Sequence, residues 1–465
     1  MRSRIAAALV TLALGLALTL PGSPASASAA PPAGDISKNV EYVTNVPLAS
    51  AISIAFLDQT MFVSTVHGLY SFDITDPTNP TLLGSLPMYI WENEDMTIDT
   101  ARKLVFISRD PRGFTSPASS GDTFPYGAVH IIDVSDPHAM IQLNAFLAPA
   151  GHTTSCVDGC NYVWVGGPYA NAQTQPDWVG RPIFGFDVRD PLNVKECPKP
   201  IDTERNDGVT DYAHDVSVDP EGVAWVSGAG GVRGYWTSGR HLNPVTHKYQ
   251  KATGCDPVPY AGGGSPKSAT PSRFMHNSWR DPGIGVDGKK GNVLIATEEN
   301  VVSDCRTSGR AVTYNLDGSY HGEGWNDIKH THFRMKVLDT WTPEGAKGAQ
   351  GCDSAHWFTD NGHGLLAYAF YTEGTRFLDV SDPKNIREVG YFRPNDANTW
   401  ASYWYHDYVF VADFQRGIDV LRFHGSNSSP TVTAPISRRA PTGGLKMSPA
   451  FGFLCPFHAP RLETP

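Results

Sequence analysis

The stretch that decides the fold is Val129-His130-Ile131-Ile132-Asp133-Val134-Ser135-Asp136-Pro137, in which an apolar strand runs into an aspartate and a short polar turn closed by proline. Related phrases recur at residues 69–77, 183–191 and 376–383. The aspartates that end the first three strands are 60 residues apart (Asp73 to Asp133) and then 54 (Asp133 to Asp187). Each interval has room for four short strands, and sheets of that size bury their faces by packing on copies of themselves. The repeat therefore predicts an all-β fold, a β-propeller.

Seven blades are predicted from the inner strands, each of which ends at a turn that carries aspartate. Their expected positions are residues 51–57, 94–98, 152–157, 213–218, 275–280, 355–359 and 400–405. The last repeat lacks an outer strand, because the chain becomes polar and proline-rich after Phe423. Residues 40–46 alternate like a strand and precede the first blade, so we expect them to complete the seventh sheet and close the ring, which removes two exposed sheet edges.

The chain divides into three expected regions. Residues 1–30 carry Arg2 and Arg4, an apolar run and a small-residue stretch, which is typical of a secretory signal peptide. Residues 31–424 form the predicted propeller, and residues 425–465 are expected to be a Pro/Ser-containing tail, partly disordered. No second apolar run follows the first, so we expect a secreted protein without a membrane span.

The charge balance argues against one class of partner. The chain has 37 Lys and Arg against 47 Asp and Glu, a formal net charge of -10. This sign is wrong for neutralising phosphates, so we expect no nucleic-acid partner. An extracellular ligand, a protein or a glycan, is the expected partner.

Seven cysteines in an exported chain suggest disulfide bonds. Cys156 and Cys160 flank a turn sequence, Val157-Asp158-Gly159, and are predicted to join the two strands of a hairpin. Spacing does not determine how the remaining five are paired, and the odd total leaves at least one without a partner in this chain. These five are Cys197, Cys255, Cys305, Cys352 and Cys455.

The repeats resemble those of the LVIVD-repeat family of secreted β-propellers. The family's strand runs into a DVSDP-type turn, which residues 133–137 and 379–383 match letter for letter. Residues 231–236 and 311–315 depart from it, since no such aspartate turn is present there. The resemblance implies an exported propeller and no particular activity, because the members are mostly described as proteins of unassigned role.

Titratable residues recur at the start of the inner strands. Glu94, His214 and His276 each lie five residues before the aspartate that ends their strand, whereas His152 lies six before Asp158 and His356 four before Asp360. First residues of inner strands surround one mouth of a propeller channel. Four imidazoles and a carboxylate gathered there would suit a divalent transition metal (Zn, Cu or Fe), with the histidines as ligands. The alternative is that the histidines bond to neighbouring strands and fill the channel.

Loops that join second to third strands should lie on the same face as this mouth. They contain Arg109, Glu298 and Glu373, which we assign with Glu94 to ligand binding. No Gly-x-Ser-x-Gly elbow, phosphate loop or dinucleotide fingerprint is present in the sequence, and no catalytic residue is assigned.

The sequence thus favours an exported binding or interaction protein with a His- and Glu-lined channel mouth. The alternative is a metal-dependent extracellular enzyme, a hydrolase or an oxidoreductase, that uses the channel histidines as ligands.

Overall fold

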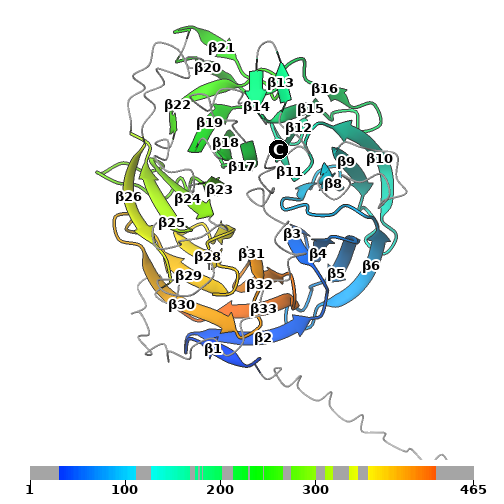
Figure 1. The fold of residues 1–465 in the computed structure, drawn as a ribbon, viewed down its shortest axis with the longest axis vertical. Helices are drawn as coiled ribbons and strands as arrows, with labels where there is room; N and C mark the ends of the chain where they lie inside the picture. Colours follow the sequence, from blue (N-terminus) through cyan, green and yellow to red (C-terminus); the bar gives the residue numbers. More distant parts are fainter. Residues whose placement is uncertain are drawn as a thin grey trace, which may run out of the picture.

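Seven antiparallel sheets are arranged as blades around a central axis in the computed structural model of the chain (Figure 1). The structure describes residues 31–111, 127–167, 173–175, 178–180, 182–201, 213–228, 231–244, 246–264, 274–299, 309–317, 335–343 and 354–425. Among these residues every regular element is a strand, and none forms a helix that is long and apolar enough to cross a membrane. The predicted seven-bladed propeller is confirmed.

Each blade is built on four strands, which in blades 1 to 6 run in chain order from the axis outward. Blade 1 contains β3 (Ala51–Leu57), β4 (Thr60–Thr65), β5 (Gly68–Asp73) and β6 (Thr81–Pro87). Blade 2 contains β7 (Thr97–Asp99), β8 (Leu104–Arg109), β9 (Gly127–Asp133) and β10 (Ile141–Ala148). Blade 3 contains β11 (Thr153–Val157), β12 (Tyr162–Gly166), β15 (Phe184–Asp187) and β16 (Lys195–Glu196). Blade 4 contains β17 (Ala213–Val218), β18 (Val223–Gly228), β19 (Gly231–Trp236) and β22 (Val258–Gly264).

The remaining blades follow the same order. Blade 5 contains β23 (Phe274–Trp279), β24 (Val293–Glu299), β25 (Ala311–Asn315) and β26 (Lys336–Trp341). Blade 6 contains β27 (Phe358–Asp360), β28 (Leu365–Ala369), β29 (Thr375–Asp379) and β30 (Arg387–Pro394). Blade 7 contains β31 (Thr399–Tyr405), β32 (Tyr408–Asp413) and β33 (Gly417–Phe423), with β2 (Val40–Val46) outermost. Two small hairpins lie outside the blades, β13 (Gln173–Gln175) with β14 (Trp178–Gly180) and β20 (Arg240–Leu242) with β21 (Tyr249–Lys251).

The N-terminal strand closes the ring as predicted. β2 pairs antiparallel with β33, from Val40 opposite Phe423 to Val46 opposite Ile418. A shorter strand that the sequence analysis did not identify, β1 (Gly34–Ile36), adds a fifth strand to the outer edge of blade 6. The two ends of the propeller are therefore held together by backbone hydrogen bonds rather than by side chains alone.

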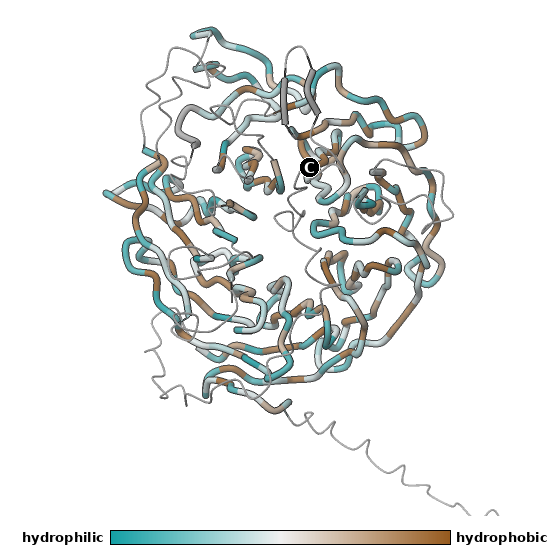
Figure 2. Tube along the Cα trace, in the orientation of Figure 1, coloured by the Kyte–Doolittle hydropathy of each residue, from teal (hydrophilic) through white to brown (hydrophobic). Residues whose placement is uncertain are grey.

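The core is divided among the interfaces between blades. The second strands β8 and β18 are buried along their whole length, because each sheet packs between two neighbours. Outer strands such as β10 are mostly exposed. Figure 2 shows apolar residues along the strands around the ring and hydrophilic residues at many peripheral turns. Burial in several separate clusters explains how a chain of this length folds without one very large core.

The aspartates of the repeated turn have the structural role expected of them. The Oδ1 atoms of Asp76, Asp136, Asp190 and Asp382 each accept a hydrogen bond from the backbone N–H two residues on. The turn also contacts the preceding blade, since the Ser71 hydroxyl donates to the Pro137 carbonyl at 2.6 Å. The phrase that identifies the repeat thus forms the turn and joins one blade to the next.

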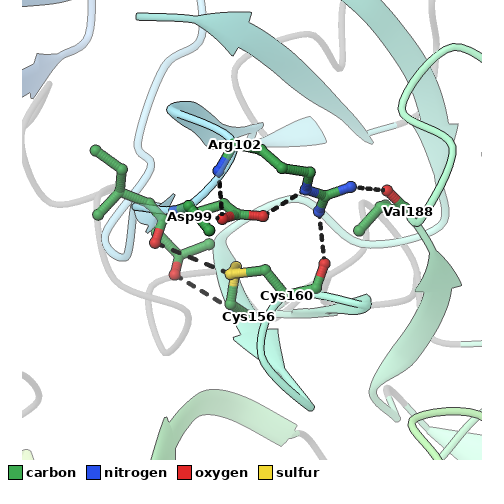
Figure 3. Close-up of a disulfide and its surroundings, with 8 residues drawn as sticks. Asp99, Arg102, Cys156, Cys160 and Val188 are labelled. Carbon is green, nitrogen blue, oxygen red and sulfur yellow. Dashed lines mark hydrogen bonds and ion pairs between the residues drawn. A yellow bond between two sulfur atoms is a disulfide. The ribbon is translucent and has the colours of Figure 1, made fainter. Parts of the chain in front are cut away.

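Two disulfide bonds are present among the described residues. Cys156 and Cys160 are joined across the β11–β12 hairpin, as predicted. Figure 3 shows the Arg102 guanidinium beside this disulfide, where it donates to the Asp99 carboxylate and to the carbonyls of Val188 and Cys160. Cys197 pairs with Cys255, a link that spacing did not reveal. Cys305, Cys352 and Cys455 lie outside the described residues, as do the predicted signal peptide and the tail from residue 426 onward.

Candidate functional site

Successive inner strands contact one another around the axis, and the candidate residues lie where these strands begin. Glu94, His152 and His356 lie in the segments that precede β7, β11 and β27. His214 lies in β17 and His276 in β23, at positions where the register of pairing to the second strand shifts. Side chains alternate between the two faces of a strand only where the strand is regular. His152 and His356 precede their strands, so their unequal spacings in the sequence do not turn these side chains away from the axis.

The five side chains meet at one point. The Oε2 atom of Glu94 lies 3.0 Å from His152 Nε2, 3.1 Å from His214 Nε2 and 2.9 Å from His276 Nε2. The other carboxylate oxygen of Glu94, Oε1, lies 3.3 Å from His356 Nε2. Five consecutive blades, from blade 2 to blade 6, therefore each contribute one group to this arrangement, which we call the axial cluster.

The opposite nitrogens of three imidazoles face outward to acceptors. His152 Nδ1 lies 2.9 Å from Asp110 Oδ2, His214 Nδ1 lies 3.2 Å from the His276 carbonyl and His356 Nδ1 lies 2.6 Å from the Trp400 carbonyl. A carbonyl oxygen only accepts hydrogen bonds, so Nδ1 of His214 and His356 carries the proton. This orientation, with Nδ1–H donated outward and Nε2 pointing inward, is the one that metal-ligating histidines adopt.

The axial cluster is almost completely removed from solvent, since each of its five residues has at most 2% of its surface exposed. Burial favours the neutral form of Glu94, but the neighbouring His152, His276 and His356 outweigh it and hold the pKa of this carboxyl well below its usual range. Burial lowers the pKa of His214 to about 4. The pKa of His276 is also well below its usual value, because burial and the adjacent imidazoles disfavour its charged form.

The pKa of His356 shifts in the opposite direction to those of His214 and His276. Burial opposes its protonation, but the Glu94 carboxylate outweighs that effect and raises the pKa of His356. The Trp400 ring lies 5.3 Å from the His356 ring, centroid to centroid. Trp400 belongs to an apolar group with Ile52 and Val66, so the side chain of blade 7 beside His356 is apolar.

Close backbone packing supports His152. Gly167 has a φ of +100°, and a Cβ at this position would lie 2.0 Å from the Cβ of His152. Any larger residue would therefore displace His152, both because of this contact and because L-residues rarely adopt this backbone conformation.

Two further groups that the sequence analysis did not assign lie near the cluster. Glu299 Oε2 is 3.9 Å from His276 Nε2, and Glu299 Oε1 accepts a hydrogen bond from the Tyr371 hydroxyl at 2.6 Å. The Tyr371 ring is 4.8 Å from that of His356. Asp110 and the buried Glu92 can form a second group of ligand atoms with His152. The sequence offered only a signal of proximity for three of these residues: Glu299 follows Glu298, Asp110 follows Arg109, and Glu92 lies two residues before Glu94.

The other assigned ligand-binding residues do not join the cluster. Glu298 is bound to Arg310, with contacts of 2.7 and 2.8 Å. Glu373 contacts Arg376 and, at 3.0 Å, Arg393. Arg109 is buried at the end of β8. Only Glu94 of the four residues assigned to ligand binding lies in the axial cluster.

The cluster has the donor set of a transition-metal site. Ligands at cis positions of an octahedral ion with bonds of about 2.1 Å are about 3.0 Å apart, whereas tetrahedral ligands are about 3.4 Å apart. The three separations of 2.9 to 3.1 Å around Glu94 Oε2 match the cis spacing. Glu94 with His152 and His214, or Glu94 with His276 and His356, brings three ligand atoms within 4.8 Å of one another, so either set can hold one ion such as Fe(II) and leaves octahedral positions for other ligands.

No protein-family model and no curated protein sequence matches the chain. Its structure is similar to that of the periplasmic gluconolactonase PpgL of Pseudomonas aeruginosa, with 14% identity, 77% of this chain and 88% of the other covered, and a TM-score of 0.48. It is also similar to the β-propeller domain of Myceliophteria thermophila Cps50 (Swd1), with 8% identity, 82% and 99% covered, and a TM-score of 0.49. A chain of the mitotic checkpoint complex matches with 10% identity, 90% and 100% covered, and a TM-score of 0.47.

Proposed function

We propose that this protein is an exported propeller that binds one first-row transition-metal ion at the axial cluster, and that this metal centre is its functional site. The observation that carries the proposal is the convergence of four histidine Nε2 atoms on one buried carboxylate. The propeller fold itself fits a binding role, since it gathers side chains from many blades at one axis.

The hydrogen-bonding pattern around His214 supports a cation. Its Nδ1 carries the proton that goes to the His276 carbonyl, so a neutral His214 presents a lone pair at Nε2. That lone pair is 3.1 Å from Glu94 Oε2, which is also an acceptor. Two acceptors at this distance repel each other in a buried site, and a metal ion bound by both removes the repulsion.

The donor set favours an ion that accepts octahedral geometry. Zinc in proteins is mostly four-coordinate and tetrahedral, whereas three imidazole nitrogens lie at cis-octahedral distances from Glu94 Oε2. Iron(II) suits a mixture of imidazole and carboxylate ligands at this geometry, and copper(II) suits a tetragonal set of nitrogens. We therefore place iron(II) before copper and zinc.

One specific observation favours a metal-dependent enzyme over a purely structural ion. Each set of ligand atoms that lie close enough together has three members, and the apolar Trp400 ring lies beside His356. An octahedral ion held by three protein donors retains open positions, which is the property that distinguishes catalytic from structural metal sites. Binding of azide to the metal-loaded protein, followed by absorption spectroscopy, tests for an open position.

The central test is the metal content of the purified protein. We expect about one transition-metal ion per chain, measured by elemental analysis, and its loss in His214→Ala and His276→Ala. The matched control is His424→Ala, because His424 forms an exposed pair with Glu41 at 2.6 Å, far from the axis in the sheet order. Folded protein that binds none of Fe, Cu or Zn when each is supplied in excess would refute the metal centre and leave the channel-filling interpretation.

Export and the resemblance to the LVIVD-repeat family remain part of the proposal. Two disulfide bonds in the described residues fit an oxidising compartment. Recovery of the protein from the culture medium, with an N-terminus near residue 31, is the expected result. An intact N-terminus on protein that stays in the cell would contradict export.

A further inference from the structure

A cavity of about 430 Å³ is lined by residues of the inner strands that come after the axial cluster along the chain. Its residues follow the cluster residues along the inner strands: Asp95 follows Glu94, Asn277 follows His276, and Trp357 follows His356. Asp360, at the end of β27, lines it farther along the same channel. The volume is in the range of small-molecule sites.

The walls of the cavity combine hydroxyl groups with aromatic rings. Ser155, Ser278 and Thr359 contribute hydroxyls, and Trp357 and Tyr403 contribute rings. The Trp357 Nε1 atom is buried and donates to no group among the described residues. A bound molecule that offers hydrogen-bond acceptors would satisfy this donor, and the rings can stack on an apolar face of the same molecule.

The cavity is lined by carboxyl groups and by no cationic side chain among the described residues. Asp95 and Asp360 line it, and none of the described lining residues is Lys, Arg or His. Asp215, which is fully buried, contacts the carboxyl of Asp95. Burial and the adjacent Asp281 carboxyl raise the pKa of Asp360 to about 8, which indicates that a positive charge is lacking in this region. At neutral pH Asp360 is therefore mostly protonated when no ligand is bound, and a bound cation would favour its ionised form.

We propose that this channel cavity binds a small hydroxylated ammonium compound of the amino-sugar class, with its ammonium group facing Asp95 or Asp360 and its sugar face against Trp357 and Tyr403. The Ser155 and Thr359 hydroxyls, which donate to Asp95 and to the Ser402 carbonyl, can accept hydrogen bonds from a hydroxylated ring, and the Trp357 N–H can donate to it. The aromatic rings cover its apolar face, and the ammonium group pairs with an ionised carboxylate. The inference does not depend on a metal in the axial cluster.

Three probes that share one sugar scaffold test the proposal: glucosamine in its ammonium form, neutral N-acetylglucosamine and anionic glucuronate. Binding to the full mature chain is followed by titration calorimetry and by Trp fluorescence. We expect glucosamine to bind at least about tenfold more tightly than N-acetylglucosamine, as a partly buried charge pair allows, and glucuronate not to bind.

Two variants test the residues involved. Asp360→Asn should reduce the preference for glucosamine severalfold, and Trp357→Phe, which keeps a ring but removes the N–H donor, should weaken glucosamine binding severalfold. Asp95→Asn provides a second carboxylate variant should Asp360→Asn fold poorly. Asp407→Asn is the control, because Asp407 is exposed and pairs with Arg422 on the outer part of blade 7.

The outcomes separate this proposal from the metal centre. The His214→Ala protein should retain the preference for glucosamine even if it loses the metal. No binding of glucosamine at millimolar concentration, equal binding of the neutral sugar, tighter binding of glucuronate, or a preference that both carboxylate variants leave unchanged would each overturn the inference.

Discussion

Replacing Glu94 by Gln removes one negative charge from the centre of the axial cluster and keeps the size of the side chain. The carboxylate oxygens of Glu94 lie 2.9 to 3.3 Å from four Nε2 atoms, and the residue is 2% exposed. At an effective dielectric constant of about 20, two unit charges about 3 Å apart interact by about 5.5 kcal/mol, which corresponds to about four decades in a binding constant. Because Gln still offers an oxygen donor, we expect metal affinity to fall between about 10²- and 10⁴-fold.

The assay is competition for the metal against a chelator of known affinity, performed on wild-type protein and on Glu94→Gln. The matched control is Glu41→Gln, which alters a second His–Glu contact whose residues are 44% and 49% exposed at their side chains. We expect the control to bind metal as the wild type does. Equal metal affinities of Glu94→Gln and wild type would refute the assignment of Glu94 as a ligand.

Three further perturbations address the support of the cluster and the stability of the fold. Gly167→Ala should reduce metal content without changing a ligand, because the added Cβ would lie 2.0 Å from that of His152; an unchanged metal content would contradict this contact. The pKa of Asp360 is raised from 3.8 to about 8, so the folded state binds more protons than the unfolded state between these pH values. The free energy of unfolding should therefore fall as the pH rises from about 4 to about 8, by at most about 1.4 kcal/mol per pH unit. Asp360→Asn should flatten that slope in denaturant titrations at several pH values, whereas Asp256→Asn, on an exposed turn, should not. Loss of the Cys197–Cys255 bond, which joins residues 58 apart, should lower the free energy of unfolding by about 4 kcal/mol. Loss of the Cys156–Cys160 bond, which joins residues 4 apart, should lower it by about 2 kcal/mol. The reverse order in denaturant titrations would argue against loop-closure entropy as the main cause.

The fold was predictable because its signal is local and repeated. The Asp-turn-Pro phrase depends on residues two apart, such as Asp136 and the His138 N–H, so it can be recognised without knowing any distant contact. The missing outer strand of the last blade and the unpaired strand at residues 40–46 then predicted the closure by β2 and β33. The Cys156–Cys160 bond was predictable for the same reason, since both residues belong to one hairpin.

The candidate site was predictable only in part. The position of His214 and His276 in similar strands suggested a shared place near the axis, and the structure brings them together with Glu94. His152 and His356 have different spacings, and their convergence depends on segments that precede the regular strands. Asp110, Glu299 and Tyr371 were not assigned because their roles depend on contacts between different blades or on distant loops.

The sequence by itself determined the number of blades, the way the ring closes and the hairpin disulfide, because each follows from periodicity and from residues that are close along the chain. Only the tertiary structure decided which side chains meet at the axis and which are bound elsewhere, as with Glu298 at Arg310 and Glu373 at Arg376. The physical reason is that a contact across the axis joins residues as distant as Glu94 and His356, and its geometry is set by the combined packing of all seven sheets.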